Sequence, residues 1–213
     1  MREQSTSVLA SFIWKTEEKC RIRKAENGLR RIARFEKVSF SEFEKCYGEL
    51  CDSVQKCDEA EEQKNQTTGN CTSAECIYDA IVLPRRATAG SAGYDFFSTI
   101  DVELMPGESV KIPTGIRAYM EPGWVLMLYP RSGLGFKYRM QLANTVGVID
   151  SDYYGSDNEG HIQIKITNDS RDGKRLRIKA GDAFAQGVFT EYGITEDDDV
   201  ETSRNGGFGS TSK

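Results

Sequence analysis

Turn-forming residue pairs interrupt the second part of this sequence at short intervals, at Pro106-Gly107, Pro122-Gly123, Asp172-Gly173 and Gly181-Asp182. Between them, apolar and β-branched residues come in short runs that lack helical periodicity. Isoleucines alternate with polar residues over 162–168, as in a strand with one buried face. We therefore expect an all-β sandwich or barrel. Its strands are predicted at 77–83, 110–120, 125–129, 146–149, 162–168, 176–179 and 183–190.

The first 77 residues have a different character, with an apolar stripe at helical spacing. The residues of this stripe are Phe43, Cys46, Tyr47, Leu50, Val54 and Cys57. Ser39 and Glu42 have the spacing of a capping box, which predicts that a helix starts there. Residues 32–38 alternate like an edge strand. We expect a tail over 1–29, a strand, helix and polar loop over 30–77, a β core over 78–200 and a flexible arm over 201–213.

All six cysteines lie in the first 77 residues, at positions 20, 46, 51, 57, 71 and 76. Because the N-terminus lacks a secretory pattern, free thiols are expected rather than a disulfide framework. The sequence has no CxxC pair and one histidine, His161, which disfavours a structural zinc site.

Charge and hydropathy narrow the class of protein. The net charge of −5 argues against a nucleic-acid-binding protein. No apolar run approaches the roughly 18 residues of a membrane-spanning helix. We therefore expect a cytoplasmic protein that binds neither nucleic acid nor membrane.

Three segments carry residues suited to catalysis or phosphate binding. Residues 130–135 place an arginine, a serine and two glycines directly after a strand, a composition that suits an anion but is common in loops. Asp150 ends a strand, where it could activate a water or cap its own backbone. The glycine-rich C-terminus holds Arg204 and Phe208, which suits either a disordered tail or a lid over a nucleotide.

Taken in order, five segments resemble the five motifs of the trimeric dUTP pyrophosphatases, usually called dUTPases. The segments are 92–96, 130–133, 144–153, 180–186 and 204–211. The similarity covers 78–213, and 31–39 with the following helix resembles the N-terminus of dUTPases from Firmicutes and their phages. The resemblance implies a distorted jelly roll, or β-clip, in a homotrimer that exchanges C-terminal arms and carries an N-terminal edge strand and helix. It also implies hydrolysis of dUTP to dUMP and pyrophosphate, which limits uracil in DNA and supplies dUMP for dTMP synthesis.

The resemblance assigns roles to individual residues. Asp150 would be the general base, and Asp95 would order waters around Mg²⁺, which has no direct protein ligand. Asn144 would read uracil, and Tyr153 would pack against the deoxyribose and exclude a 2′-hydroxyl. The full set of expected substrate-binding residues is Arg131, Ser132, Gly133, Asn144, Val148, Ile149, Tyr153, Gln186, Arg204, Phe208, Gly209, Ser210 and Thr211.

The sequence departs from the dUTPase pattern at three places. Residues 156–160 lengthen a turn, Arg139 stands where a glycine is common, and 1–77 exceed what the family core requires. Two alternatives stay open. A dCTP deaminase shares the fold, although the Pro-Arg-Ser-Gly loop and the fifth motif argue against one. Because some phage dUTPases bind repressor proteins, the N-terminal helix or the 156–160 loop could also bind a regulatory protein, alongside catalysis.

Overall fold

The computed structural model describes residues 29–58 and 73–202. The chain divides into two compact units, 1–33 and 34–213. The second unit carries the β-sheets and every predicted site residue that the structure describes. Among the described residues, no helix has both the length and the apolar character needed to cross a bilayer.

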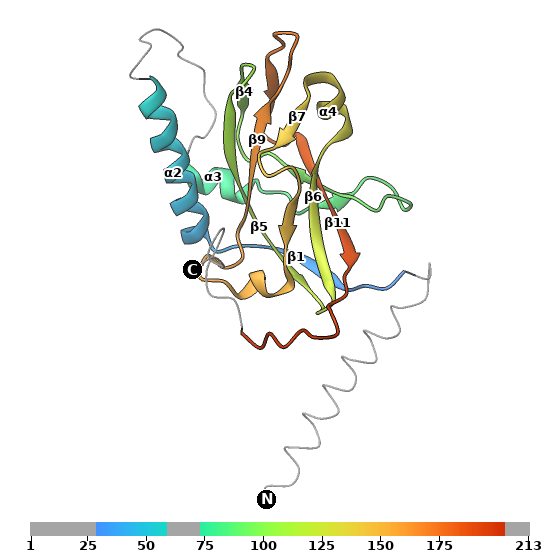
Figure 1. Cartoon of the computed structure of the whole chain (residues 1–213). Helices are drawn as coiled ribbons and strands as arrows, with labels where there is room; N and C mark the ends of the chain where they lie inside the picture. The colour runs from blue at the N-terminus through green and yellow to red at the C-terminus, as the bar shows by residue number, and fades with distance from the viewer. Residues whose placement is uncertain (1–28, 59–72, 203–213) are drawn as a thin grey trace, which may run out of the picture. The chain divides into compact units, whose positions relative to one another are not determined.

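Two antiparallel sheets and a two-stranded ribbon form the body of this unit (Figure 1). One sheet has the order β1 (Ala33–Lys37), β5 (Ser109–Met120), β9 (Ile162–Asn168) and β7 (Met140–Leu142). The other has the order β2 (Arg85–Arg86), β3 (Tyr94–Phe97), β11 (Ala183–Glu191), β6 (Trp124–Pro130) and β8 (Gly147–Ile149). The ribbon pairs β10 (Leu176–Ile178) with β4 (Val102–Leu104). These sheets confirm the predicted β class, and β1 is the expected edge strand.

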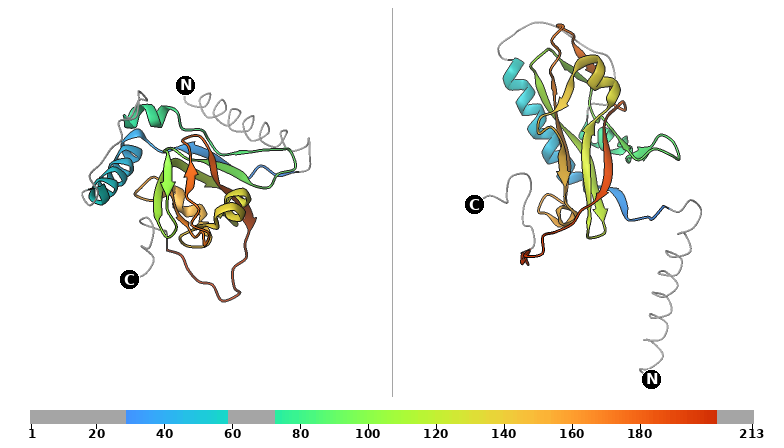
Figure 2. Two further views of the ribbon diagram at one scale, coloured as in Figure 1. Left: turned by 90° about the horizontal axis from the view of Figure 1, so that it is seen from above. Right: turned by 45° about the vertical axis from the view of Figure 1, so that its right-hand side comes forward.

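Four short or helical elements accompany the sheets: α2 (Phe40–Asp58), α3 (Ala74–Asp79), α4 (Ser132–Tyr138) and the 3₁₀ turn η1 (Ser151–Gly155). Helices α2 and α4 lie on opposite sides of the sheets (Figures 1 and 2). Phe43, Cys46 and Leu50 on α2 are buried, which confirms this part of the predicted apolar stripe, while the side chains of Val54 and Cys57 lie outside the described ones. The Ser39 side chain accepts the Glu42 N–H at 3.2 Å, so the helix begins where its cap predicted.

The alternation predicted for β9 is also confirmed. Ile162, Ile164 and Ile166 are buried, while Lys165 between them is exposed. They belong to a core shared with β5, β6 and β11, through Ile112, Leu126 and Phe184 among others. The two sheets therefore bury one common apolar interior, as a sandwich requires.

The strand predicted at 77–83 is wrong. The segment instead begins inside α3, because Ser73 caps that helix by accepting the Cys76 N–H. Residues 80–84 then run on outside any strand. The sequence prediction also missed α4 and the short strands β2, β3, β4 and β7, whose apolar runs are too brief to stand out.

The cysteines follow the prediction only in part. Cys46 and Cys51 are free thiols, as expected. Cys76 is disulfide-bonded, so the expectation of free thiols is wrong at this position. Spacing along the chain does not show which cysteines meet in space, which is why the bond was not foreseen.

Candidate active site

Three strands of the five-stranded sheet bring the first, second and fourth sequence motifs together. Gln186 on β11 lies opposite Asp95 of β3 on one side and opposite Tyr129 of β6 on the other. Arg131, just beyond β6, places its Nε 3.4 Å from Asp95 Oδ1. The Gln186 amide donates to the Pro130 carbonyl at 3.3 Å. Asp95, Arg131 and Gln186 therefore form one polar cluster, which we call the Asp95 cluster.

Gly93 leaves room for the amide of this cluster. A Cβ at Gly93 would lie 2.8 Å from Gln186 Oε1, closer than real Cβ contacts allow. The position therefore admits only glycine unless the Gln186 side chain moves.

Helix α4 starts directly beside the Asp95 cluster. Arg131 occupies its N-cap with extended backbone, and Ser132 and Gly133 open the first turn as exposed residues. The first N–H groups of a helix have no partner within it, so this end suits an anion. Arg139 closes the helix in the left-handed region, with φ 52° and ψ 30°. This geometry explains why a glycine is common at that position. Here Arg139 donates from Nε and Nη2 to Asp169, each at 3.2 Å.

A second set of predicted residues lies on the chain reversal between β7 and β8, which we call the hairpin although β7 pairs with β9 and β8 with β6. Because β7 belongs to one sheet and β8 to the other, residues 143–146 cross between the sheets. Thr145 has a positive φ of 66° and donates its N–H to the Leu142 carbonyl at 2.9 Å. Asn144 is exposed on this hairpin. Val148 is 52% exposed and the Ile149 side chain only 3%, so Ile149 can offer a ligand little beyond its backbone.

A pocket of about 370 Å³ opens beside the hairpin. Its walls come from both sheets and are mostly apolar, with amide and lysine side chains among them. The lining residues are Lys111, Leu128, Leu142, Ala143, Asn144, Gly147, Ile149, Gln163, Ile164 and Lys165. A small cleft with apolar walls and a few convergent polar groups is typical of a site for a small molecule.

Asp150 follows β8 and heads the turn η1. Its backbone is extended, and its side chain makes no capping hydrogen bond to that turn.

Tyr153 within η1 is 4% exposed. Its hydroxyl donates to the His161 carbonyl at 2.9 Å and accepts from the Asn158 amide at 2.8 Å.

Within one chain, Asp95 and Asp150 lie far apart. Strands β3 and β8 are three strand spacings apart in the sheet, about 14 Å. Along β6, Asp95 belongs to the row of Tyr129, whereas Ile149, next to Asp150, pairs with Leu126, about 10 Å away. The chain thus presents two half-sites. One is the Asp95 cluster, and the other is the hairpin with η1. The remaining predicted residues, Arg204, Phe208, Gly209, Ser210 and Thr211, lie outside the described residues.

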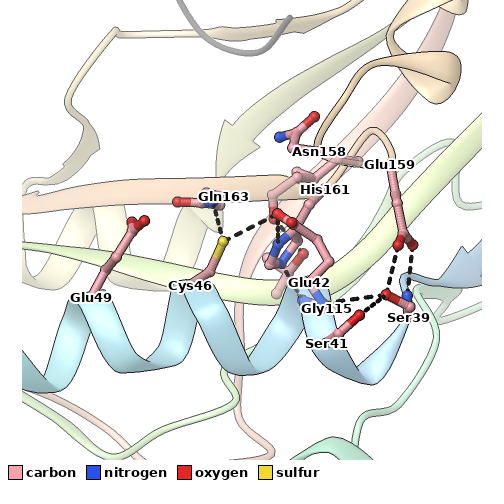
Figure 3. A network of polar contacts seen from close by, with 12 residues as sticks. Ser39, Ser41, Glu42, Cys46, Glu49, Gly115, Asn158, Glu159, His161 and Gln163 are labelled. Carbon is pink, nitrogen blue, oxygen red and sulfur yellow. Dashed lines mark hydrogen bonds and ion pairs between the residues drawn. The ribbon is translucent and has the colours of Figure 1, made fainter.

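Sequence reasoning missed a buried polar cluster between α2 and β9 (Figure 3). Glu42, Cys46 and His161 place potential metal-binding atoms within 4.8 Å of one another. The Gly115 N–H donates to His161 Nε2 at 2.9 Å, so the proton of the neutral ring is on Nδ1. Nδ1 then carries its proton toward Glu42 Oε1, 3.6 Å away, without a hydrogen-bond partner among the described residues, and in this tautomer it is not a metal ligand. Burial lowers the pKa of His161 to about 4 and raises that of Cys46 to about 12. The only available sequence signal was that His161 is the sole histidine.

Comparison with known proteins identifies the family. The dUTPase family model matches residues 79–212. The deoxyuridine 5′-triphosphate nucleotidohydrolase of Lactococcus lactis subsp. lactis (strain IL1403) is 42% identical over 134 residues, 62% of this chain and 88% of that protein. The enzyme of the same name from Shigella sonnei (strain Ss046) is 40% identical over 135 residues, 60% of this chain and 85% of that protein. The crystal structure of dUTPase from Streptococcus mutans shares 41% identity with a TM-score of 0.49, and the match covers 54% of this chain and 88% of that one. The chain belongs to the dUTPase family.

Proposed function

We propose that this chain hydrolyses dUTP to dUMP and pyrophosphate in active sites shared between three copies of itself. The observation that carries the proposal is the separation of the two half-sites by more than 10 Å within one chain. One half-site suits phosphates and the other a nucleobase with an adjacent carboxylate. Two or more copies can place these halves around one nucleotide, whereas a single copy cannot.

The base would bind at the hairpin. Asn144 offers an amide at the edge of the apolar pocket, and the neighbouring backbone groups can complete the pattern that reads uracil. The methyl group of thymine would collide with a tight hairpin, and cytosine would present a donor where uracil presents an acceptor. A mismatch of this kind is rejected strongly, because it leaves a buried polar group unpaired.

The triphosphate would bind at the Asp95 cluster and the start of α4. Ser132 and Gly133 offer a hydroxyl and backbone N–H groups, and Gln186 offers an amide. Arg131, near Asp95, supplies positive charge and supports the loop. Hydrolysis of a phosphoanhydride depends mainly on such positioning and charge stabilisation.

Asp150 would act as the general base. Its carboxylate takes a proton from a water, whose oxygen attacks the α-phosphorus while the bond to the pyrophosphate leaving group breaks. The half-buried carboxylate stands at the end of β8, next to the hairpin that would hold the base. This placement supports attack at the innermost phosphorus, the one nearest to the sugar.

The polar residues of the site fit magnesium held by the substrate. Asp95 supplies the only carboxylate of the Asp95 cluster and lies near Arg131. One carboxylate does not fill the octahedral shell of Mg²⁺, which prefers to keep several waters. The donors therefore fit an ion held by phosphate oxygens and waters, with Asp95 accepting from one of those waters. When bound, Mg²⁺ neutralises charge on the phosphates.

We expect the shared site to form in a trimer, with a contribution from the C-terminus. Arg204 would approach the γ-phosphate, Phe208 would stack on uracil, and Gly209, Ser210 and Thr211 would complete the site from the arm of another copy. Phe136 on α4 is 92% exposed and Val148 on β8 is 52% exposed. Apolar side chains exposed beside both half-sites support association there. The enzyme would act in the cytoplasm, limiting uracil in DNA and supplying dUMP.

The deciding experiment measures pyrophosphate release from dUTP, dTTP, dCTP and UTP side by side, with light scattering to determine the oligomeric state. We expect cleavage of dUTP alone, by a trimer and with Mg²⁺. Ammonia release from dCTP would support the deaminase alternative. A monomer that cleaves dUTP would contradict the shared site.

A further inference from the structure

The loop 156–160, which lengthens the turn after η1, is bonded directly to Tyr153. The Asn158 Nδ2 group donates to Tyr153 Oη at 2.8 Å, and this hydroxyl donates in turn to the His161 carbonyl at 2.9 Å. The tyrosine oxygen is therefore held from two sides. With only 4% of the residue exposed, Tyr153 is held almost entirely inside the protein.

The loop backbone also presses against the backbone of η1. A Cβ on Gly160 would lie 2.7 Å from the Tyr153 carbonyl oxygen and 2.8 Å from Tyr154 Cα. Glu159 and Gly160 both have positive φ, at 56° and 71°, which folds the chain tightly over the turn. A side chain at Gly160 would force the loop away from Tyr153.

The far side of the loop is fastened to α2 (Figure 3). Both Glu159 carboxylate oxygens accept from Ser39, at 2.7 Å from its N–H and 2.6 Å from its hydroxyl. On the other flank, His161 accepts the Gly115 N–H. The helix and the loop, the two segments named for a possible regulatory role, thus contact each other, and together they anchor Asn158.

We propose that Asn158 is a positioning residue that sets the selectivity for deoxyribose over ribose by holding Tyr153. This inference rests on the proposed function and on the expected role of Tyr153, which would pack against the deoxyribose as the wall beside the 2′ carbon. The Tyr153 side chain excludes the added 2′-hydroxyl only if its position is fixed. If the side chain can move aside, the site admits a substrate larger by one oxygen. Asn158 prevents that movement by bonding the atom of Tyr153 farthest from the backbone.

The test compares kcat/KM for UTP and dUTP in the full-length protein and its variants. Asn158→Ala is expected to raise the UTP-to-dUTP ratio about fivefold, the factor that loss of one intramolecular hydrogen bond typically produces. Tyr153→Phe removes this bond together with the one to the His161 carbonyl, and is expected to raise the ratio at least as much. Adding Asn158→Ala to Tyr153→Phe should raise the ratio no further, because the bond between the two side chains is already broken. Asp157→Ala, an exposed neighbour in the same loop, is the matched control and should leave the ratio unchanged.

The outcomes separate the two proposals. A wild-type protein that does not cleave dUTP overturns the proposed function itself. A wild-type protein that cleaves dUTP while Asn158→Ala leaves the ratio within twofold overturns only the inference, as do additive effects in the double variant. If Asn158→Ala does not fold, Tyr153→Phe carries the test, and an unchanged ratio in that variant overturns the inference.

Discussion

Glu159 binds Ser39 across 120 positions of sequence, with one carboxylate oxygen on the Ser39 N–H and the other on its hydroxyl. Ser39 in turn accepts the Glu42 N–H, which starts α2. Glu159 thus bonds the backbone just ahead of a helix N-terminus, where negative charge is also favoured by the helix dipole. One side chain joins two segments in which this sequence departs from the dUTPase pattern.

Glu159→Gln should weaken the attachment of α2. The variant loses the charge-assisted bonds, which are stronger than neutral ones, and a loss of about 1 kcal/mol lowers the melting temperature of a protein of this size by roughly 2–4 °C. Hydrogen bonds from Ser39 lower the pKa of Glu159, so its contribution is present above the usual pKa of 4.5 and is lost as pH falls below it. Circular dichroism melts at pH 7 and pH 3 check both points. Equal melting temperatures for wild type and variant at pH 7 would contradict the role.

His161 should make stability fall with acidification in a higher pH range. Its pKa is lowered from 6.5 to about 4, mainly by burial, although nearby Glu159 favours the charged form. The unfolded chain therefore takes up a proton as pH falls from about 6.5 to about 4, while the folded chain does not. Stability is then lost by up to about 1.4 kcal/mol per pH unit.

Melting temperatures between pH 7 and pH 4.5 measure this slope. The matched variant is His161→Gln, which keeps an acceptor for the Gly115 N–H but does not titrate. It should be less stable at pH 7 and show a shallower slope. A slope equal to that of wild type would mean that another group titrates in this range.

Two elements, β9 and the start of α2, could be predicted from the residues next to them in the sequence. The alternation over 162–168 gave β9, and the Ser39 cap gave the start of α2, because burial period and capping are written in neighbouring residues. Residues 77–83 were misread because they are apolar and β-prone, while the deciding signal was the Ser73 cap upstream.

The geometry of the site depends on contacts that no local pattern encodes. Motif order named Asp95 and Asp150, but their separation follows from the placement of β11 and β6 between β3 and β8. The bond between Asn158 and Tyr153 likewise depends on how the 156–160 loop folds back, through positive φ at Glu159 and Gly160. Glutamate is uncommon in that conformation, so this fold-back could not be predicted from the residue types.

Asp150→Asn should preserve the fold and dUTP binding while lowering kcat at least about a hundredfold, the usual effect of losing a general base. The amide matches the carboxylate in shape but does not accept the proton of water. Steady-state pyrophosphate release measures kcat, and calorimetric titration with a non-hydrolysable dUTP analogue measures binding. Asp152→Asn, two residues along in the same turn, serves as the control and should retain kcat within a few-fold. Near-normal turnover by Asp150→Asn would assign the base to another residue.

Gly93→Ala should damage the site through Gln186 alone. The new Cβ would lie 2.8 Å from Gln186 Oε1, so the amide must move away from its place beside Asp95 and the Pro130 carbonyl. Loss of one bond to a charged phosphate oxygen is expected to lower kcat/KM for dUTP about tenfold. Gly90→Ala is the matched control, because a Cβ there meets nothing within 4 Å. If both variants keep wild-type kcat/KM at unchanged melting temperature, then Gln186 does not contact the substrate. Phosphate binding would then involve only the other residues of the Asp95 cluster and the start of α4.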